Sequence, residues 1–212
     1  MTNPRSKSEK LSETTKSYLN EIYIEELFGR KKDITNKYIE KGIYVEEESL
    51  NLIQSHYLGK LLIKNKEHFE NEYIKGTPDV IIDRVIDTKS SWDIFTFSEA
   101  DGNNKDYYWQ GQGYMNLTKK KEFDLAYCLT NAPEHMIVDE KTKQMYKRGL
   151  IGLDGSIEFD EMENEIEKNM KFDDIPLEKR VKIFSFEFDD KAFELLKQRI
   201  IDSREYLNSI TF

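Results

Sequence analysis

The chain of 212 residues contains a single cysteine, Cys128, so it cannot form a disulfide within itself. One thiol also excludes a cysteine-bound zinc site and an iron–sulfur cluster, because each needs several cysteines. No apolar run approaches the roughly 20 residues that a membrane-spanning helix requires. The polar N-terminus lacks the apolar segment of a signal peptide. These absences predict a cytoplasmic protein with no membrane partner.

The formal net charge of −9 is unfavourable for a nucleic-acid partner, but the charge is unevenly distributed. Residues 151–178 hold ten of the 41 acidic residues and two of the 32 basic ones, which leaves 31 acidic and 30 basic residues elsewhere. Binding depends on local charge, so a basic groove can still form in the rest of the chain. Its candidates are Arg30, Lys31, Lys32, Lys37, Lys41 and Lys119 to Lys121.

The length suits one domain with a sizeable core. We expect residues 1–12 to form a flexible tail and residues 13–212 to form a single domain with N-terminal helices. The acidic stretch at about 151–178 is interpreted as an insertion with a solvated surface, although a DNA-mimicking regulator or a partner site would have the same composition.

Hydrophobic periodicity changes along the chain from helical to strand spacing and back. Helices are expected at 13–28, 38–62, 106–117, 161–170 and 190–207, with Gly42 and Gly59 as candidate interruptions of the second one. Strands are expected at 69–74, 80–89, 124–130 and 182–188, with Asp83-Arg84 at a turn. This order predicts an α/β or α+β fold, in which helices flank a central, mainly antiparallel mixed sheet.

The most informative residues lie in the middle of the chain, where charges interrupt two apolar runs. Gly76-Thr77-Pro78-Asp79 precedes one run, and Asp87-Thr88-Lys89 ends the next. Charged side chains among strand residues are costly unless they are paired or bind a metal. A divalent cation held by Asp79 and Asp87, with Lys89 beside it, would compensate all three. Such a centre supports phosphodiester hydrolysis, and hard oxygen ligands suit Mg²⁺.

The spacing within this segment constrains its geometry. Asp87 and Lys89 point to the same face of a strand, because side chains alternate. A three-residue turn near Asp83-Arg84 would set Asp79 opposite Asp87, whereas a two-residue turn would shift it by one position. Pro78 is suited to a strand start, where no ladder N–H is needed.

Two flanking motifs support a catalytic centre. Upstream, Gly42-Ile43-Tyr44-Val45-Glu46 places a glutamate on a helix, with Glu47 as the alternative acid. Downstream, Gln110 and Tyr114 are four residues apart and lie on one helix face.

The order G-x-x-x-E, T-P-D, D-x-K, Q-x-x-x-Y resembles the PD-(D/E)xK nuclease superfamily. The resemblance is to the branch of phage lambda exonuclease, YqaJ-type viral recombinases and RecB-type nucleases, and it spans about residues 40–130. It implies a restriction-endonuclease-like core.

The same resemblance implies roles for individual residues. Lys89, Asp87, Asp79 and Glu46 would be catalytic, and the three acids would bind metal together with the Thr88 backbone carbonyl. Gln110 and Tyr114 would support the site or contact DNA. Ser90 is a further candidate for a phosphate contact. Mg²⁺ would be the cofactor, with Mn²⁺ as a substitute and no iron–sulfur cluster.

The function expected from these motifs is a phage-type exonuclease that acts on linear duplex DNA in recombination or repair. An endonuclease or an RNA-directed nuclease would carry the same motifs. A non-catalytic nucleic-acid- or partner-binding module on a nuclease fold is the alternative from another class. A single-strand annealing protein is a candidate partner, and a homo-oligomer is a candidate assembly.

Overall fold

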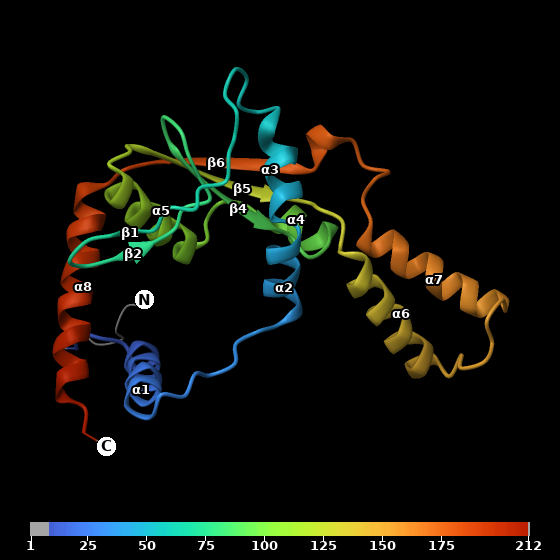
Figure 1. Cartoon of the computed structure of the whole chain (residues 1–212), viewed down its shortest axis with the longest axis horizontal. Helices are drawn as coiled ribbons and strands as arrows, with labels where there is room; N and C mark the ends of the chain where they lie inside the picture. Colours follow the sequence, from blue (N-terminus) through green and yellow to red (C-terminus); the bar gives the residue numbers. More distant parts are fainter. Residues whose placement is uncertain (1–8, 212) are drawn as a thin grey trace.

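The computed structural model describes residues 9–211, and a four-stranded mixed sheet forms its centre (Figure 1). The strand order is β3, β4, β5, β6, with β4 and β5 parallel and both outer pairings antiparallel. This confirms the expected mainly antiparallel mixed sheet. The strands are Val80–Ile81 (β3), Val85–Ser90 (β4), Glu122–Cys128 (β5) and Val181–Glu187 (β6). A separate two-stranded ribbon pairs β1 (Phe69–Glu70) with β2 (Lys75–Gly76).

Alternating strand residues build two cores. Val80 and Ile86 pack with Leu50 and Ile53 of α3 (Glu46–Gln54). Val85 packs instead with a second set of apolar side chains, which includes residues of β5 and of α5 (Lys105–Thr118). The side chains of this second core that are fully buried besides Val85 are Met115, Phe123 and Leu125. The sheet therefore lies between helices, as an α/β layer architecture requires.

Helix α5 approaches the sheet closely because it carries a glycine at the contact. A Cβ atom at Gly111 would lie 2.3 Å from the ring of Phe123 on β5, so no larger residue fits without movement. The helix begins at an Asn104 cap, whose side chain accepts hydrogen bonds from the N–H groups of Asp106 and Tyr107. A helix with two internal glycines is thus stabilised by its cap and by packing.

Helices α6 (Glu134–Arg148) and α7 (Ile157–Met170) form a hairpin that projects from the sheet (Figure 1). The hairpin has its own apolar core, in which Ile137 and Met162 are fully buried. Ion pairs join its two helices, among them Lys141 to Glu167 at 2.7 Å. Helix α6 was not expected from the sequence, and α7 starts four residues before the predicted helix.

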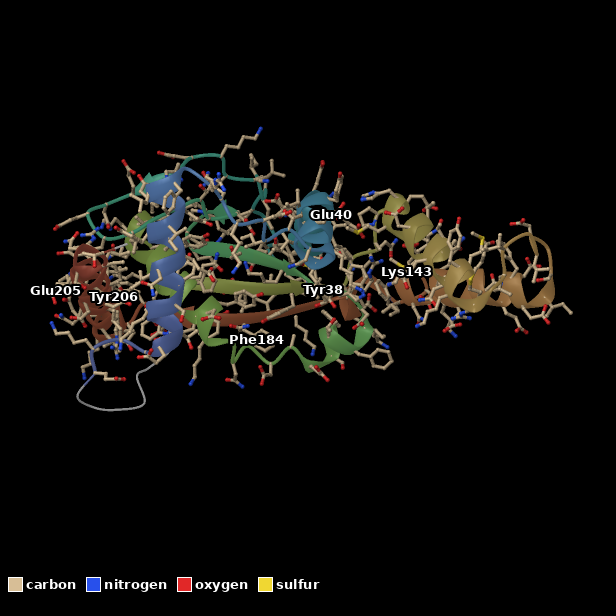
Figure 2. The ribbon with its side chains drawn as sticks, turned by 90° about the horizontal axis from the view of Figure 1, so that it is seen from below. Tyr38, Glu40, Lys143, Phe184, Glu205 and Tyr206 are labelled. Carbon is tan, nitrogen blue, oxygen red and sulfur yellow. The ribbon has the colours of Figure 1, made fainter. Side chains whose placement is uncertain are left out.

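The opposite end of the molecule contains α1 (Glu13–Phe28) and α8 (Asp190–Ser209). Figure 2 shows Glu205 and Tyr206 of α8 at this end and Lys143 of α6 at the other. Large apolar side chains of α1 are exposed, with exposed fractions of 61% for Tyr18 and 49% for Leu27. Of the expected tail, residues 1–8 lie outside the described part of the chain.

The helix expected over 38–62 is wrong as a single element. It divides into α2 (Lys37–Tyr44) and α3, because Val45 leaves helical geometry with φ −102° and ψ 15°. α3 ends at Gln54, whose side chain binds the backbone of Lys60 and Leu62 in the following loop. The short helices α4 (Ile94–Glu99) and η1 (Leu177–Lys179) complete the fold. Within residues 9–211, no helix is both long and apolar enough to span a bilayer.

Candidate active site

The turn between β3 and β4 brings the two predicted carboxylates together. Val80 pairs with Ile86 and Ile81 with Val85, which leaves a three-residue turn. The next position in this register sets Asp79 opposite Asp87. Of the two turns that the sequence allowed, the structure contains the one that aligns the acids directly.

Asp79 is held by Thr88, which lies between Asp87 and Lys89 on β4. The Thr88 N–H donates to Asp79 Oδ2 at 2.7 Å, and the Thr88 hydroxyl donates to the same oxygen at 3.0 Å. Two donors on one oxygen fix the carboxylate at the edge of the sheet and leave Oδ1 for another ligand. From the sequence we predicted a role only for the backbone carbonyl of Thr88. The hydrogen bond from its hydroxyl to Asp79 was not predicted.

Asp87 is buried, with only 2% of the residue exposed, and its charge is poorly compensated. The Lys89 ammonium contacts the Oδ2 atom as an ion pair. No donor among residues 9–211, however, has hydrogen-bond geometry toward that oxygen. Burial raises the pKa of Asp87 to about 6, against the opposing charge of Lys89. The charges of Asp79 and Glu46 raise it further.

Lys89 stays a cation in this environment. Burial lowers its pKa, but the negative charge of Asp87 in direct contact with the ammonium outweighs burial, so the pKa lies above its ordinary value. The ammonium also lies 4.8 Å from the ring centroid of Tyr107, which packs against Tyr127. Lys89 is therefore suited to hold an anion or orient a water, not to accept a proton.

Glu46 is the glutamate of its run whose charge reaches Asp87. It is the first residue of α3 and forms an ion pair with Lys64. Glu47 is exposed, and Glu48 binds Arg180 at 3.1 Å in a structural contact. The geometry thus favours Glu46 over Glu47 as the third acid.

Gln110 and Tyr114 lie together on α5, where the Gln110 amide donates to the Tyr114 hydroxyl at 3.0 Å. The charges of Asp87 and Asp79 raise the pKa of Tyr114, secondary to its burial. Gly76 lies against Tyr114, because a Cβ atom at Gly76 would be 2.6 Å from the Tyr114 ring. The glycine of the G-T-P-D motif is therefore required for the close approach of this segment to Tyr114.

No protein-family model and no curated protein sequence matches the chain. Among solved structures, a phage-related exonuclease from Haemophilus somnus 129PT is similar with a TM-score of 0.75 and 26% identity. The similarity covers 98% of this chain and 88% of that one. This chain has the phage-exonuclease fold of the PD-(D/E)xK superfamily.

The same fold is found in more distant structures. An alkaline exonuclease from Laribacter hongkongensis is similar with a TM-score of 0.61 and 15% identity, over 99% of this chain and 83% of the other. Its complex with dAMP gives a TM-score of 0.58 and 14% identity, over 91% and 79%. These similarities support the exonuclease fold.

Two polar residues near the motifs have structural contacts in this exonuclease fold. The Ser90 hydroxyl pairs with Thr130 Oγ1 at 2.6 Å, which ties β4 to the segment after β5. Gln112 is fully buried; its amide donates to Glu187 O at 2.9 Å, and its Oε1 accepts from Asp189 N–H. Of the two glutamines on α5, Gln112 anchors the helix and Gln110 is paired with Tyr114.

The donor set fits a hard divalent cation. Asp79 and Asp87 supply carboxylate oxygens, one of them buried without a hydrogen bond, and hard cations prefer such oxygens. Within residues 9–211, no three His, Cys, Asp or Glu side chains converge as a complete metal cluster. Glu46 forms an ion pair with Lys64 instead.

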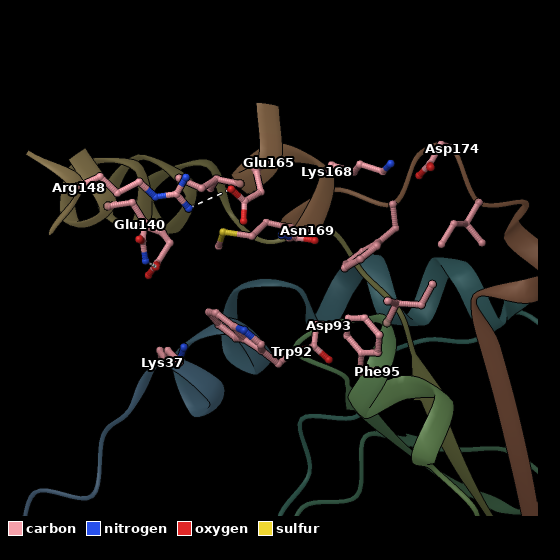
Figure 3. A pocket seen from close by; sticks show the side chains of 16 residues that line it. Lys37, Trp92, Asp93, Phe95, Glu140, Arg148, Glu165, Lys168, Asn169 and Asp174 are labelled. Carbon is pink, nitrogen blue, oxygen red and sulfur yellow. Dashed lines mark hydrogen bonds and ion pairs between the residues drawn. The ribbon is translucent and has the colours of Figure 1, made fainter. Parts of the chain in front are cut away.

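A cavity of about 460 Å³ lies apart from these acids, between the hairpin and the segments at Lys37 and Trp92 (Figure 3). Lys37 lies 4.2 Å from the centroid of the Trp92 ring. Across the cavity, Arg148 pairs with Glu165 at 2.9 Å. The cavity contains none of the motif residues, so the catalytic candidates lie outside it.

Proposed function

We propose that the protein is a metal-dependent DNA exonuclease that hydrolyses phosphodiester bonds at the ends of linear duplexes. The observation that carries this proposal is the pairing of Asp79 with the under-compensated Asp87, beside a cationic Lys89. The same residues lie in a fold shared with a phage-related exonuclease, which supports nuclease activity over a purely structural acid pair.

Asp79, Asp87 and the Thr88 carbonyl would hold the metal, with Glu46 as a third acid. When bound, Mg²⁺ or Mn²⁺ supplies charge stabilisation for the phosphate and lowers the pKa of a coordinated water. Thr88 keeps Asp79 in place through its two hydrogen bonds.

Lys89 supplies a fixed positive charge at the scissile phosphate. Its contact with Asp87 and the Tyr107 ring orient the ammonium, so little reorganisation is needed when substrate binds. Gln110 and Tyr114 form a polar wall beside the acids and would contact the DNA backbone.

Digestion of end-labelled linear duplex with Mg²⁺ or Mn²⁺ tests the proposal. Lys89→Ala should reduce the rate by about 100- to 1,000-fold, the usual cost of one electrostatic group in a transition state. Lys147→Ala, on the exposed surface of α6, is the matched control and should retain full activity. Equal activity in both variants would sink the proposed mechanism.

The substrates separate the alternatives. Resistance of covalently closed circles supports exonuclease action, and their cleavage indicates an endonuclease. Faster cleavage of a matched RNA indicates an RNA-directed nuclease. DNA binding without Mn²⁺ binding in calorimetry, and without cleavage, indicates a non-catalytic module. A role in recombination or repair, a single-strand annealing partner and a homo-oligomer stay predictions.

A further inference from the structure

The loop that follows α3 places a second lysine beside the G-T-P-D motif and Glu46. Asn65 anchors this loop, because its N–H donates to Asp79 O at 2.7 Å and its amide donates to Pro78 O at 3.0 Å. Lys64, the preceding residue, is thereby held beside the G-T-P-D motif. Its ammonium forms the ion pair with Glu46.

The two lysines of the site differ in how firmly they are held. Lys89 is enclosed by Asp87 and the Tyr107 ring, and its side chain is 23% exposed. The side chain of Lys64 is 48% exposed, and within residues 9–211 it forms an ion pair with Glu46 alone. A solvent-screened pair of this kind contributes little, so a competing cation can displace it easily.

Displacement of Lys64 by a divalent cation would change the net charge of the site. Three acids, Glu46, Asp79 and Asp87, face two lysines, so the group carries a net charge of −1 and repels DNA phosphates. A divalent cation would reverse the sign to +1. Glu46 would then bind the cation, and the Lys64 ammonium would be free for another anion.

We propose that Lys64 is an exchangeable counter-ion of the active site, which neutralises Glu46 until a metal binds and then contacts the DNA phosphate backbone. Lys64 is a positioning and DNA-contact residue in this scheme, and metal binding and DNA binding become coupled through it. The inference rests on the proposed nuclease function and deepens it.

Calorimetric titration with Mn²⁺ tests the first half, using wild type, Lys64→Ala and the exposed neighbour Lys66→Ala. Removal of the competing ammonium should tighten Mn²⁺ binding by about two- to fivefold in Lys64→Ala, as expected for a screened pair. Lys66→Ala should bind Mn²⁺ as wild type does. Unchanged or weaker Mn²⁺ binding in Lys64→Ala overturns the exchange.

Fluorescence anisotropy with a phosphorothioate-protected duplex tests the second half. In Mn²⁺, Lys64→Ala should bind DNA more weakly, and the slope of log K against log salt should fall by about one phosphate contact. In EDTA the slope should match wild type, because Lys64 is then paired with Glu46. A slope change of equal size with and without Mn²⁺ contradicts the release of Lys64.

Glu46→Gln gives an independent check, because it frees Lys64 without metal. In EDTA this variant should bind DNA more tightly, and adding Lys64→Ala should remove more affinity than it removes from wild type. Additive effects in this double-mutant cycle would refute the coupling.

Asp87→Asn separates the hypothesis of a metal site from the hypothesis of Lys64 exchange. If Mn²⁺ binding is absent in wild type, or is unaffected by Asp87→Asn, the metal site itself is wrong and the exchange falls with it. If binding depends on Asp87 while Lys64→Ala behaves like Lys66→Ala, only the exchange is wrong.

Discussion

Two aspartates on neighbouring strands, Asp87 on β4 and Asp124 on β5, are equally buried, each with 2% of the residue exposed. Asp124 accepts hydrogen bonds at 2.7 Å from the hydroxyls of Tyr57 and Ser185, and Arg84 bridges both of its oxygens. Asp87 has only the ion pair with Lys89, and one of its oxygens accepts no hydrogen bond from the described residues. Burial alone therefore does not distinguish a functional acid from a structural one.

The partners differ because the two residues point to different sides of the sheet. Asp124 is level with Ile86 in the β4–β5 register, next to Asp87, so alternation separates their side chains. One side provides Tyr57 from the segment after α3. The other side provides Lys89 and aromatic side chains of α5. Asp87 has the ion pair with Lys89 but no hydrogen-bond network like that of Asp124, and a buried carboxylate of this kind carries a desolvation cost that a metal can relieve.

The largest contrast should appear when Asp124 loses its charge. Asp124→Asn weakens the charge-assisted hydrogen bonds that Asp124 accepts, although Arg84 keeps its ion pair with Glu122. The free energy of unfolding should fall by about 1.5–3 kcal/mol. Urea unfolding monitored by circular dichroism measures this. Unchanged stability would mean that the network around Asp124 contributes nothing beyond packing.

The same substitution at Asp87 should act in the opposite direction. In EDTA, Asp87→Asn should raise the free energy of unfolding by at most about 3 kcal/mol, the equivalent of its pKa shift from 3.8 to about 6. The variant should be inactive on linear duplex. A destabilised Asp87→Asn protein would show that Asp87 is structural, like Asp124.

The pH dependence of stability gives a smaller effect with a defined sign. Folded Asp87 holds its proton more tightly than the unfolded chain does, so between pH 4 and pH 6 its contribution falls as pH rises. The slope should reach at most about 1.4 kcal/mol per pH unit. Subtracting the profile of Asp87→Asn, both in EDTA, isolates this group; a difference that grows more favourable with pH would contradict the assignment.

The smallest expected effect concerns the second acid of the pair. Thr88→Val removes the hydroxyl donor to Asp79 but keeps the N–H donor and the β-branched shape. One neutral hydrogen bond corresponds to about 0.5–1.5 kcal/mol, so activity should fall about two- to tenfold. Thr88→Ser restores a hydroxyl and should recover most of the loss. Equal rates in the Val and Ser variants would show that the Thr88 hydroxyl does not contribute to activity.

Much of the fold could be predicted because apolar periodicity is local information. Strands β4, β5 and β6 and helices α1, α5 and α8 were located within a few residues. Helix α6 was missed, because its sequence carries many charges and its few buried apolar side chains pack in a separate cluster with α7 rather than in the core at the sheet. The break at Val45 was also missed, since a single non-helical residue leaves no periodic trace.

The sequence by itself determined which chemistry the chain carries: two aspartates and a lysine at strand spacing, a glutamate upstream, and a glutamine and tyrosine on one helix face. Only the tertiary structure decided how these groups are used. It selected the three-residue turn that aligns Asp79 with Asp87, paired Glu46 with Lys64, and separated Asp87 from the equally buried Asp124. The physical reason is that a side chain's partners come from distant segments, whereas its spacing is set along the chain.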